Sequence, residues 1–305
     1  MSITMHDVAR MAGVSIKTVS NVINDYPYIK PETRQRVTEA IATLDYRPNL
    51  SARSLRSGRT GVISLIIPDL RNAYFAELAV SVMKAAGAQG LSVVIEQFES
   101  DRDRELNLLR GPRSLMVDGI LYSVLALGEE DAHLLAEVKT PMVLLGERIF
   151  KGPTDHVTMQ NTEGVKAATE HLLSLGRRRI AALGAHRGEV VGSAGLRLAG
   201  YREALTEAGL SYDEPLVGEV GGWFRSTGAQ AMAQLIRSGA RFDALVAFND
   251  ALALGAMRTL QEAGIRVPDD VAVIGFDDLD ETRYSLPTLS SINPGREEIA
   301  TVAVG

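Results

Sequence analysis

Residues 4–24 read TMHDVARMAGVSIKTVSNVIN, a pattern that predicts two short helices joined by a tight turn. Thr4 can cap the first helix, with Asp7 three residues later as the acidic partner of a capping box. Gly13 suits the left-handed residue that follows a helix, and Ser15 can cap the second helix. Two short helices joined in this way are typical of a helix-turn-helix.

The apolar residues of both helices recur at helical spacing, so that each helix has an inward and an outward face. The residues expected to face inward are Val8, Ala9, Met11, Ala12, Val19, Val22 and Ile23. Those expected to face outward are Ile16, Lys17, Ser20 and Asn21. They lie near the N-terminal part of the second helix, where a helix-turn-helix contacts base edges in the major groove.

A third helix is expected from Pro31 to about Leu44, since a first helical position does not need the N–H that proline lacks. Its inward stripe consists of Val37, Ala40, Ile41 and Leu44. Three short amphipathic helices would also fit an ordinary bundle with no DNA role. The tight turn between the first two helices and the distribution of charge favour DNA binding.

The charge of the chain is uneven. Residues 1–60 hold nine Lys/Arg and five Asp/Glu, a net charge of +4, whereas the rest of the chain has a net charge of −10 and the whole chain −6. A basic head on an acidic body fits phosphate binding by one end of the molecule. The overall acidity argues against a protein that coats nucleic acid along its whole length.

Length and composition exclude several classes of protein. The chain has 305 residues and 46% hydrophobic content, which fits a globular protein of about two or three domains. It has no cysteine, and therefore no disulfide, thiolate metal site or cysteine nucleophile. No secretion signal and no apolar run of membrane-spanning length is visible. We therefore expect a cytoplasmic protein without a membrane partner.

From Gly61 onward, short apolar runs alternate with helical patterns. The runs that predict strands are GVISLIIP (61–68), LSVVIEQF (91–98), VDGILYS (117–123), PMVLLGE (141–147), DHVTMQ (155–160), RRIAALG (178–184), LVGEV (216–220), ALVAFN (244–249) and VAVIGFD (271–277). The helices between them are expected near 74–89, 101–110, 129–138, 162–175, 195–209, 226–238 and 250–263. This alternation predicts an α/β body of two doubly wound lobes with parallel sheets covered on both faces.

Polar residues gather where these strands end, which is where ligands of doubly wound folds bind. They include Asp69, Glu147, Arg148, Asn249, Asp250, Asp277 and Asp278, and Arg197 lies near the start of a helix. Together with Trp223, the only tryptophan, they offer paired donors and acceptors and an aromatic face, a set that suits a sugar. Taken singly, Asp and Asn after a strand often only cap helices, and Tyr74 and Phe75 could simply belong to the core.

These segments together resemble the lactose-repressor (LacI/GalR) family of bacterial transcription regulators over essentially the whole chain. The motifs are DVARMAGVSIKTVSNVIN, KPETRQRVTEAIATLDYRPN, SARSLRSG, PDLRNAYF, RLAGYREAL, FNDALALGAM and VAVIGFDD. The resemblance implies a helix-turn-helix headpiece at 1–48, a hinge helix at 49–60 and a periplasmic-binding-protein-like body at 61–305. The N-lobe is expected at about 61–160 with 292–305, and the C-lobe at about 161–291.

The resemblance also implies roles for individual residues at the DNA. Ile16, Lys17 and Asn21 match base-reading positions, and Thr18, Ser20 and Asn24 match positions that contact phosphates. The hinge segment, which includes Asn49, Ala52 and Arg53, is expected to become helical on DNA, with Leu55 wedged into the minor groove at a central base step. Two chains are needed, since the hinge helices pair across a near-palindromic operator.

In the body, Arg197 and Asp277 match the residues with which the family grips effector hydroxyls. Trp223 and Asn249 match further cleft positions. Asp69, Phe75, Glu147 and Met159 match in loops where the alignment is ambiguous. These residues favour a pyranose-like polyol over a purine, since the chain has only 5% aromatic residues with which to stack a base.

The chain departs from the family pattern at three places. Lys30 stands where Ser or Thr commonly precedes the proline, which weakens that cap and offers a phosphate contact. Ile16 is apolar where some relatives carry a polar base reader, and could contact a thymine methyl. The chain ends at Gly305, inside a helix expected from near Arg296, so the C-terminal end is expected to be either truncated or disordered.

The expected function is therefore that of a homodimeric repressor that binds operator DNA and is controlled allosterically by a small molecule, most simply a sugar, between the lobes. One alternative is a solute-binding protein, since the body alone has that fold. The basic head and the missing signal sequence disfavour it. The other is an enzyme, but the five histidines are scattered, and HExxH, nucleophile-elbow and phosphate-loop motifs are absent. We expect no catalysis, no metal and no cofactor besides the effector.

Overall fold

The structure is a computed structural model that describes residues 3–46, 59–99, 101–111, 114 and 116–305. The chain forms two compact units, Met1–Thr60 and Gly61–Gly305. We call the first unit the headpiece and the second the body.

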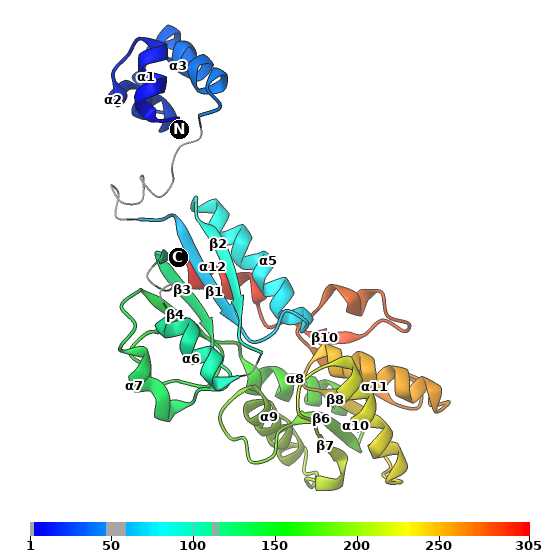
Figure 1. Ribbon diagram of the computed structural model, residues 1–305. Coiled ribbons are helices and arrows are strands. Elements are labelled where there is room, and N and C mark those ends of the chain that lie inside the picture. Colours follow the sequence, from blue (N-terminus) through cyan, green and yellow to red (C-terminus); the bar gives the residue numbers. More distant parts are fainter. Residues whose placement is uncertain (1–2, 47–58, 100, 112–113, 115) are drawn as a thin grey trace. The chain divides into compact units, whose positions relative to one another are not determined.

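Three helices form the headpiece: α1 (Met5–Ala12), α2 (Ile16–Ile23) and α3 (Pro31–Thr43) (Figure 1). The predicted caps are confirmed. The Thr4 backbone N–H donates to Asp7 Oδ2 at 3.0 Å, and the Thr18 N–H donates to Ser15 Oγ at 3.1 Å. Gly13 ends α1 with a φ of 65°. Lys30 precedes Pro31 without a side-chain cap hydrogen bond.

The headpiece core corrects two of the predicted orientations. Val8, Val19 and Val37 are completely buried in it, as expected. Met11, which was expected to face inward, is 53% exposed, because the two short helices leave no partner for its position. Ile16, which was expected to face outward, is half-buried against the core, because an apolar first residue of α2 can fold back onto it.

The body contains two parallel five-stranded sheets (Figure 1). The first sheet has the order β2-β1-β3-β4-β5, with strands β1 (Val62–Ile67), β2 (Ser92–Gln97), β3 (Gly119–Ser123), β4 (Met142–Leu145) and β5 (Asp155–Val157). The second has the order β10-β9-β8-β6-β7, with strands β6 (Ile180–Ala185), β7 (Val217–Glu219), β8 (Ala244–Ala247), β9 (Ala272–Phe276) and β10 (Ser290–Ile292). The predicted fold, an α/β body with two doubly wound lobes, is confirmed.

Helices cover the sheets and define the two lobes. The N-lobe consists of the first sheet with α5 (Ala73–Ala88), α6 (Arg102–Arg110), α7 (Ala132–Leu135) and α12 (Arg296–Val304). The C-lobe consists of the second sheet with α8 (Asn161–Ser174), α9 (Ser193–Glu207), α10 (Arg225–Arg237) and α11 (Asp250–Glu262). The chain returns to the N-lobe after β10, where α12 packs against α5.

Two elements differ from the sequence prediction. The helix expected at 129–138 is a 3-10 turn (Glu129–Asp131) followed by α7 alone. Asp131 accepts a hydrogen bond from the Gly128 N–H at 3.1 Å and pairs with Arg102 at 2.5 Å, which holds the chain in the tight turn. Strand β10 was not predicted, because three residues that include two serines give no apolar run.

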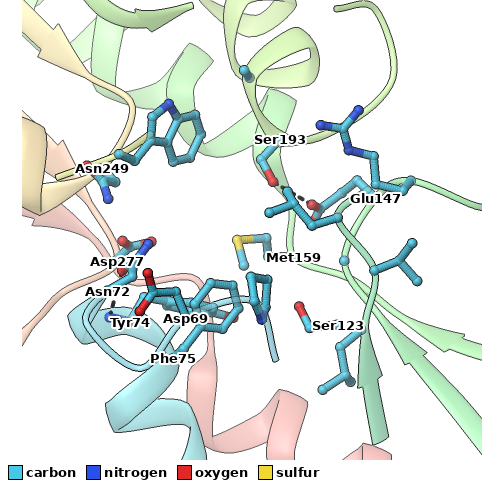
Figure 2. A pocket seen from close by; sticks show the side chains of 18 of the residues that line it. Asp69, Asn72, Tyr74, Phe75, Ser123, Glu147, Met159, Ser193, Asn249 and Asp277 are labelled. Atoms are coloured by element: carbon cyan, nitrogen blue, oxygen red, sulfur yellow. Dashed lines mark hydrogen bonds between the residues drawn. The ribbon is translucent and has the colours of Figure 1, made fainter. Parts of the chain in front are cut away.

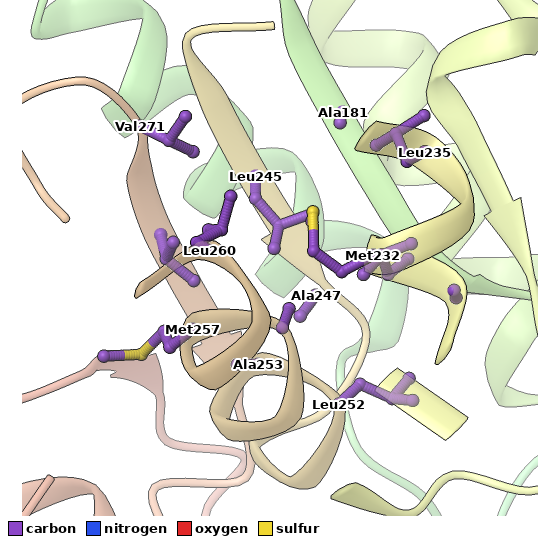
Figure 3. Close-up of a cluster of buried hydrophobic side chains, with 14 of the residues drawn as sticks. Ala181, Met232, Leu235, Leu245, Ala247, Leu252, Ala253, Met257, Leu260 and Val271 are labelled. Atoms are coloured by element: carbon purple, nitrogen blue, oxygen red, sulfur yellow. The ribbon is translucent and has the colours of Figure 1, made fainter. Parts of the chain in front are cut away.

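Hydrophobic clusters fill both faces of each sheet. In the C-lobe, Leu252, Met257 and Leu260 of α11 belong to the same buried cluster as Met232 of α10 and Leu245 of β8 (Figure 3). Apolar runs such as that of β8, buried at every position, are typical of strands covered on both sides. None of the helices in the described residues is long and apolar enough to cross a membrane.

Candidate functional site

A cavity of about 370 Å³ lies in the body, with walls from both lobes. It is lined by every residue that the sequence assigned to effector binding: Asp69, Phe75, Glu147, Met159, Arg197, Trp223, Asn249 and Asp277. Figure 2 labels Asp69, Phe75, Glu147, Met159, Asn249 and Asp277 among them. The residues gather because parallel strands end at the same edge of a sheet. Asp69 lies just beyond β1, Asn249 beyond β8 and Asp277 directly after β9. The structure thus brings the set together, while its effector role stays a prediction.

Arg197, near the start of α9, is the central cation of the cavity and is 2% exposed. Its Nε donates to Asn161 Oδ1 at 2.7 Å, its Nη1 to the Phe248 carbonyl, and its Nη2 to Met159 Sδ at 3.0 Å. The guanidinium also lies 3.8 Å from the centroid of the Phe276 ring. Burial lowers the pKa of Arg197, and nearby carboxylates oppose this shift. The side chain is therefore fixed in one orientation before any ligand arrives.

Asp277 is the acidic partner of Arg197, with a distance of 4.0 Å between Oδ1 and Nη1. Burial raises its pKa well above the ordinary value, and the charge of Arg197 opposes this shift. Its φ of 119° is a conformation that residues other than glycine rarely adopt. Such a backbone costs on the order of 1–3 kcal/mol and is found at ligand clamps and active sites.

Trp223 and Asn249 supply a ring and an amide. The Trp223 indole N–H donates to the Gly184 carbonyl at 3.0 Å, which fixes the ring beside Arg197, 4.9 Å from the guanidinium to the ring centroid. Asn249 Oδ1 accepts from the Leu252 N–H at 2.8 Å and so caps α11. Its Nδ2 is buried without a hydrogen-bond partner in the described structure. The residue therefore both caps a helix and keeps one donor for a ligand.

Glu147 joins the two lobes across the cavity. It accepts hydrogen bonds from Ser193 Oγ of the C-lobe at 2.6 Å and from Thr158 Oγ1 at 2.8 Å, and Figure 2 shows the first of these on the side opposite Asn249 and Asp277. Both carboxylate oxygens of Glu147 are thus in use within the protein. Glu147 therefore links the two lobes at the cavity, and its contact with an effector stays a prediction.

A second contact between the lobes was not predicted. Arg148 Nη2 lies 3.0 Å from Glu189 Oε2, which also accepts from His186 Nδ1 at 2.9 Å. Burial alone would raise the pKa of Glu189, but the hydrogen bond from His186 and the charge of Arg148 outweigh it, so that the pKa is lowered. His186, Glu189 and Ser193 all follow β6, so the rule that ligands bind beyond strand ends could have found them.

The remaining predicted residues form the N-lobe wall. Asp69 pairs with Arg71 at 2.6 Å, and the hydrogen bond from Arg71 lowers its pKa. Phe75 packs edge-on against Tyr74, with ring centroids 5.3 Å apart. Tyr74 is 9% exposed and belongs to the N-lobe core while also lining the cavity. Residues at the start of α5 therefore belong both to the N-lobe core and to the cavity wall.

Asp250, next to Asn249, gives a pH-dependent prediction. It is completely buried, accepts from the Leu279 N–H at 2.9 Å and from Ser291 Oγ at 2.6 Å, and burial raises its pKa to about 7. Because the folded-state pKa exceeds the unfolded value, the stability that this group contributes is full below about pH 4 and is lost as the pH rises through 7. Relative to wild type, Asp250→Asn should therefore gain about 1–3 kcal/mol of unfolding free energy between pH 5 and pH 8.

Urea unfolding at the two pH values measures this difference. Asp270→Asn is the control, because Asp270 is an exposed acid whose pKa the hydrogen bonds from Arg266 lower to about 2. It should show no change relative to wild type over this range. If the difference in unfolding free energy between Asp250→Asn and wild type were the same at pH 5 and pH 8, the prediction would be contradicted.

The structure places the predicted DNA-binding residues of the headpiece on α2 and its C-terminal end. Lys17 and Asn24 are exposed, while Thr18, Ser20 and Asn21 are partly exposed. Thr18 Oγ1 lies 2.8 Å from Ser15 Oγ, and Asn24 Nδ2 donates to the Ser20 carbonyl at 2.8 Å, so these residues also cap α2. The hinge residues Asn49, Ala52, Arg53 and Leu55 lie outside the described residues.

The chemistry of the cavity is that of a binding site. Over the residues that the structure describes, no group of three or more His, Asp or Glu side chains could hold a metal ion. The cavity offers a cation, a carboxylate, a free amide donor and an indole ring, which together can bind a hydroxylated ligand. A helix-turn-helix headpiece and a two-lobed body with this cavity define a class of protein, the ligand-controlled transcription regulators.

Comparisons with known proteins give the family. The family model for bacterial regulatory proteins of the lacI family matches residues 4–49, and a periplasmic binding protein-like domain matches residues 169–305. Catabolite control protein A from Priestia megaterium is 33% identical over 100% of this chain and 91% of its own length. The ribose operon repressor of Escherichia coli (strain K12) is 33% identical over 99% of this chain and 91% of its own length.

Solved structures agree with these matches. A LacI-family transcriptional regulator from Sanguibacter keddieii DSM 10542 is 52% identical, with a TM-score of 0.75 over 81% of this chain and 88% of its own. The lac repressor dimer bound to operator and the anti-inducer ONPF is 28% identical, with a TM-score of 0.85 over 100% of this chain and 91% of its own. The complex of the transcriptional regulator CelR with cellobiose is 32% identical, with a TM-score of 0.70 over 99% of this chain and 91% of its own.

The chain therefore belongs to the LacI family of bacterial regulatory proteins. The function predicted from the sequence, a DNA-binding transcriptional repressor controlled by a small molecule, is confirmed at the level of the family.

Proposed function

We propose that this chain is a homodimeric repressor that binds a near-palindromic operator and is controlled by a sugar bound in the cavity between its lobes. The observation that carries the sugar assignment is the C-lobe wall of the cavity. There, the Arg197 guanidinium, the Asp277 carboxylate and the free Asn249 Nδ2 converge beside the Trp223 ring. Hydroxyls of a pyranose need such paired donors and acceptors, and the apolar face of the sugar packs on a ring. The CelR–cellobiose complex shows a relative with a sugar bound.

An apolar surface on the N-lobe supports the homodimer. Val80 and Met83 lie three residues apart on α5, and are 61% and 44% exposed. Residues at this spacing share one helix face. A second copy of the chain could cover this face, and the lac repressor structure is a dimer on operator. Two headpieces would then bind the two halves of a near-palindromic site.

The proposal places the protein in the bacterial cytoplasm, where operator DNA lies, without catalysis and without a cofactor besides the effector. The full-length match to transcription regulators supports this over a solute-binding protein, which shares only the body. In the hinge, Asn49, Ala52, Arg53 and Leu55 remain the proposed DNA contacts.

The sugar assignment is tested by titration of the full chain with D-glucose, D-galactose, D-ribose and cellobiose, with adenine as the purine comparison. Trp223 is the only tryptophan, so its emission reports on the cavity directly. We expect at least one sugar to change this emission, to raise the melting temperature and to alter operator affinity, and adenine to do none of these. Binding of adenine alone would overturn the sugar assignment.

DNA binding gives a separate prediction at Lys17, which is exposed on α2. An operator selected from random duplexes is expected to bind Lys17→Gln more weakly than wild type by about 1–3 kcal/mol, with relaxed preference at one base pair in each half-site. Lys139→Gln, an exposed lysine between α7 and β4 of the body, is the control and should leave operator affinity unchanged. Fluorescence anisotropy measures both, and equal affinities for the two variants would contradict the assignment of Lys17 to base reading.

A further inference from the structure

The loop after β9 connects the cavity to the interior of the N-lobe. Its first residue, Asp277, lines the cavity on the C-lobe side. Two residues later, Leu279 is completely buried in the hydrophobic cluster of the N-lobe, together with Leu78 of α5 and Ile299 of α12. A loop that belongs to one lobe is thus anchored in the core of the other.

Two N-lobe residues hold this loop. Arg296, the first residue of α12, donates from Nη1 to the Asp277 carbonyl at 2.7 Å, and its Nη2 lies 2.5 Å from Glu77 Oε2 on α5. The other oxygen of Glu77 accepts from the Asp280 N–H at 3.1 Å. The side chain of Arg296 is only 17% exposed. Neither Arg296 nor Glu77 lines the cavity.

We propose that Arg296 and Glu77 are positioning residues. They fix the carboxylate of Asp277 in its ligand-binding orientation and transmit occupancy of the cavity to α5. The part of the proposal that concerns a ligand rests on the proposed function above. The part that concerns the orientation of Asp277 rests on the contacts of the described residues alone.

The backbone of the loop explains why Asp277 needs such support. Asp277 and Asp278 have φ values of 119° and 49°, two consecutive positive values at residues other than glycine. A backbone of this kind persists only where surrounding contacts determine it. Besides the bond from Arg296 to its carbonyl, the Asp277 N–H donates to the Ile292 carbonyl at 2.9 Å, and the Asp278 N–H donates to Ser291 Oγ at 3.0 Å. Of these three hydrogen bonds, only the one from Arg296 comes from a residue of the N-lobe.

The same contacts give a route from the cavity to α5. The first turns of α5 contribute Tyr74, Phe75 and Leu78 to the cavity wall, and Glu77 lies among them in sequence but bonds the β9 loop instead. Arg296 joins Asp277 to Glu77 of α5 in a series of polar contacts. A ligand that contacts both Asp277 and the α5 wall therefore acts on both ends of this series. A change in the angle between the lobes must alter the distances in this series of contacts. Ligand affinity and the position of α5 are therefore coupled. The exposed face of α5 proposed for the second copy begins at Val80, three residues after Glu77.

The test compares Arg296→Met and Glu77→Gln with the matched pair Arg258→Met and Glu262→Gln in the full chain. Arg258 and Glu262 form an ion pair with a distance of 2.6 Å on the exposed face of α11. The first readout is the emission of Trp223 and its quenching by acrylamide, without ligand. Trp223 lies beside Arg197, which pairs with Asp277, so a displaced Asp277 should change both quantities in the variants of the positioning pair and in neither control.

The second readout is hydrogen exchange of the 277–280 amides, which we expect to accelerate in Arg296→Met and in Glu77→Gln. Arg296→Lys can reach only one of the two acceptors and should fall between wild type and Arg296→Met. A merely structural ion pair would lower the melting temperature and leave the Trp223 emission of the folded protein unchanged. That outcome, or exchange equal to that of the controls, would overturn the proposal.

The third readout is the dissociation constant of whichever sugar of the panel binds wild type, which should increase about fivefold or more in Arg296→Met, the size of a typical coupling between sites. An unchanged constant would overturn the route to the ligand. If no sugar binds wild type, the proposed function fails, while Trp223 emission and hydrogen exchange still decide the positioning role.

Discussion

Replacement of Arg197 by methionine is expected to lower the free energy of unfolding of the body by about 3–5 kcal/mol and to abolish effector binding. The side chain is 2% exposed, and its loss leaves Asn161 Oδ1 and the Phe248 carbonyl without their donor. It also removes the larger of the two arginine charges that lower the pKa of Asp277, so this pKa should rise further. Methionine preserves much of the apolar stem, so the loss comes from the guanidinium rather than from a cavity.

Urea unfolding followed by circular dichroism measures the stability, and Trp223 emission measures sugar binding in the folded variant. Arg258→Met serves as the control, since Arg258 is largely exposed and pairs with Glu262 on the surface of α11. It should change the stability by less than about 1 kcal/mol. An Arg197→Met protein as stable as this control would show that the buried guanidinium is not held as described.

The second large effect is expected at Gly255, where α11 crosses α10. A Cβ placed on Gly255 would lie 1.9 Å from the Arg225 carbonyl oxygen, a backbone atom that cannot turn away. A Cβ placed on Gly228 of α10 would likewise lie 2.4 Å from the Leu252 carbonyl oxygen. Gly255→Ala must therefore separate the helices, and should cost about 3 kcal/mol, at the upper end for overpacked cores. Because Asn249 begins α11 and Trp223 precedes α10, the cavity should widen as well.

Gly87→Ala is the control, and it is expected to change the stability in the opposite direction. Gly87 is exposed near the end of α5, and nothing lies within 4 Å of the position of its Cβ. Alanine there should raise stability by about 0.5–1 kcal/mol, because alanine loses less backbone entropy than glycine in a helix. Melting temperatures of the two variants measure the contrast, and a Gly255→Ala protein that melts no lower than wild type would refute the close crossing.

The headpiece shows how far local sequence carries a prediction. The capping interactions of Thr4 and Ser15 and the left-handed Gly13 depend on neighbours within a few residues, so the sequence predicts them and the structure has them. Met11 and Ile16 were misplaced because their burial depends on how the three helices pack. Helical spacing identifies a face, but in a helix of eight residues it does not fix where that face ends.

The cavity shows a similar division. The residues that directly follow apolar strands could be predicted, since parallel strands bring their ends together. What each side chain does there could not. Glu147, for example, accepts hydrogen bonds from Ser193 and Thr158, which no local pattern predicts. Glu189 and His186, which follow β6, were missed, and their contact with Arg148 arises only from the approach of the two lobes.

The sequence by itself determined the helix-turn-helix, the order of strands and helices, the family and the set of polar residues at the strand ends. These follow from caps, from hydrophobic periodicity and from motifs, all of which are local along the chain. Only the tertiary structure decided which cavity residues already have partners and how Asp277 is held. The bond from Arg296 joins residues 19 positions apart, and that of Glu77 to Asp280 spans 203. Such contacts arise when separate lobes pack together, and no local pattern specifies them.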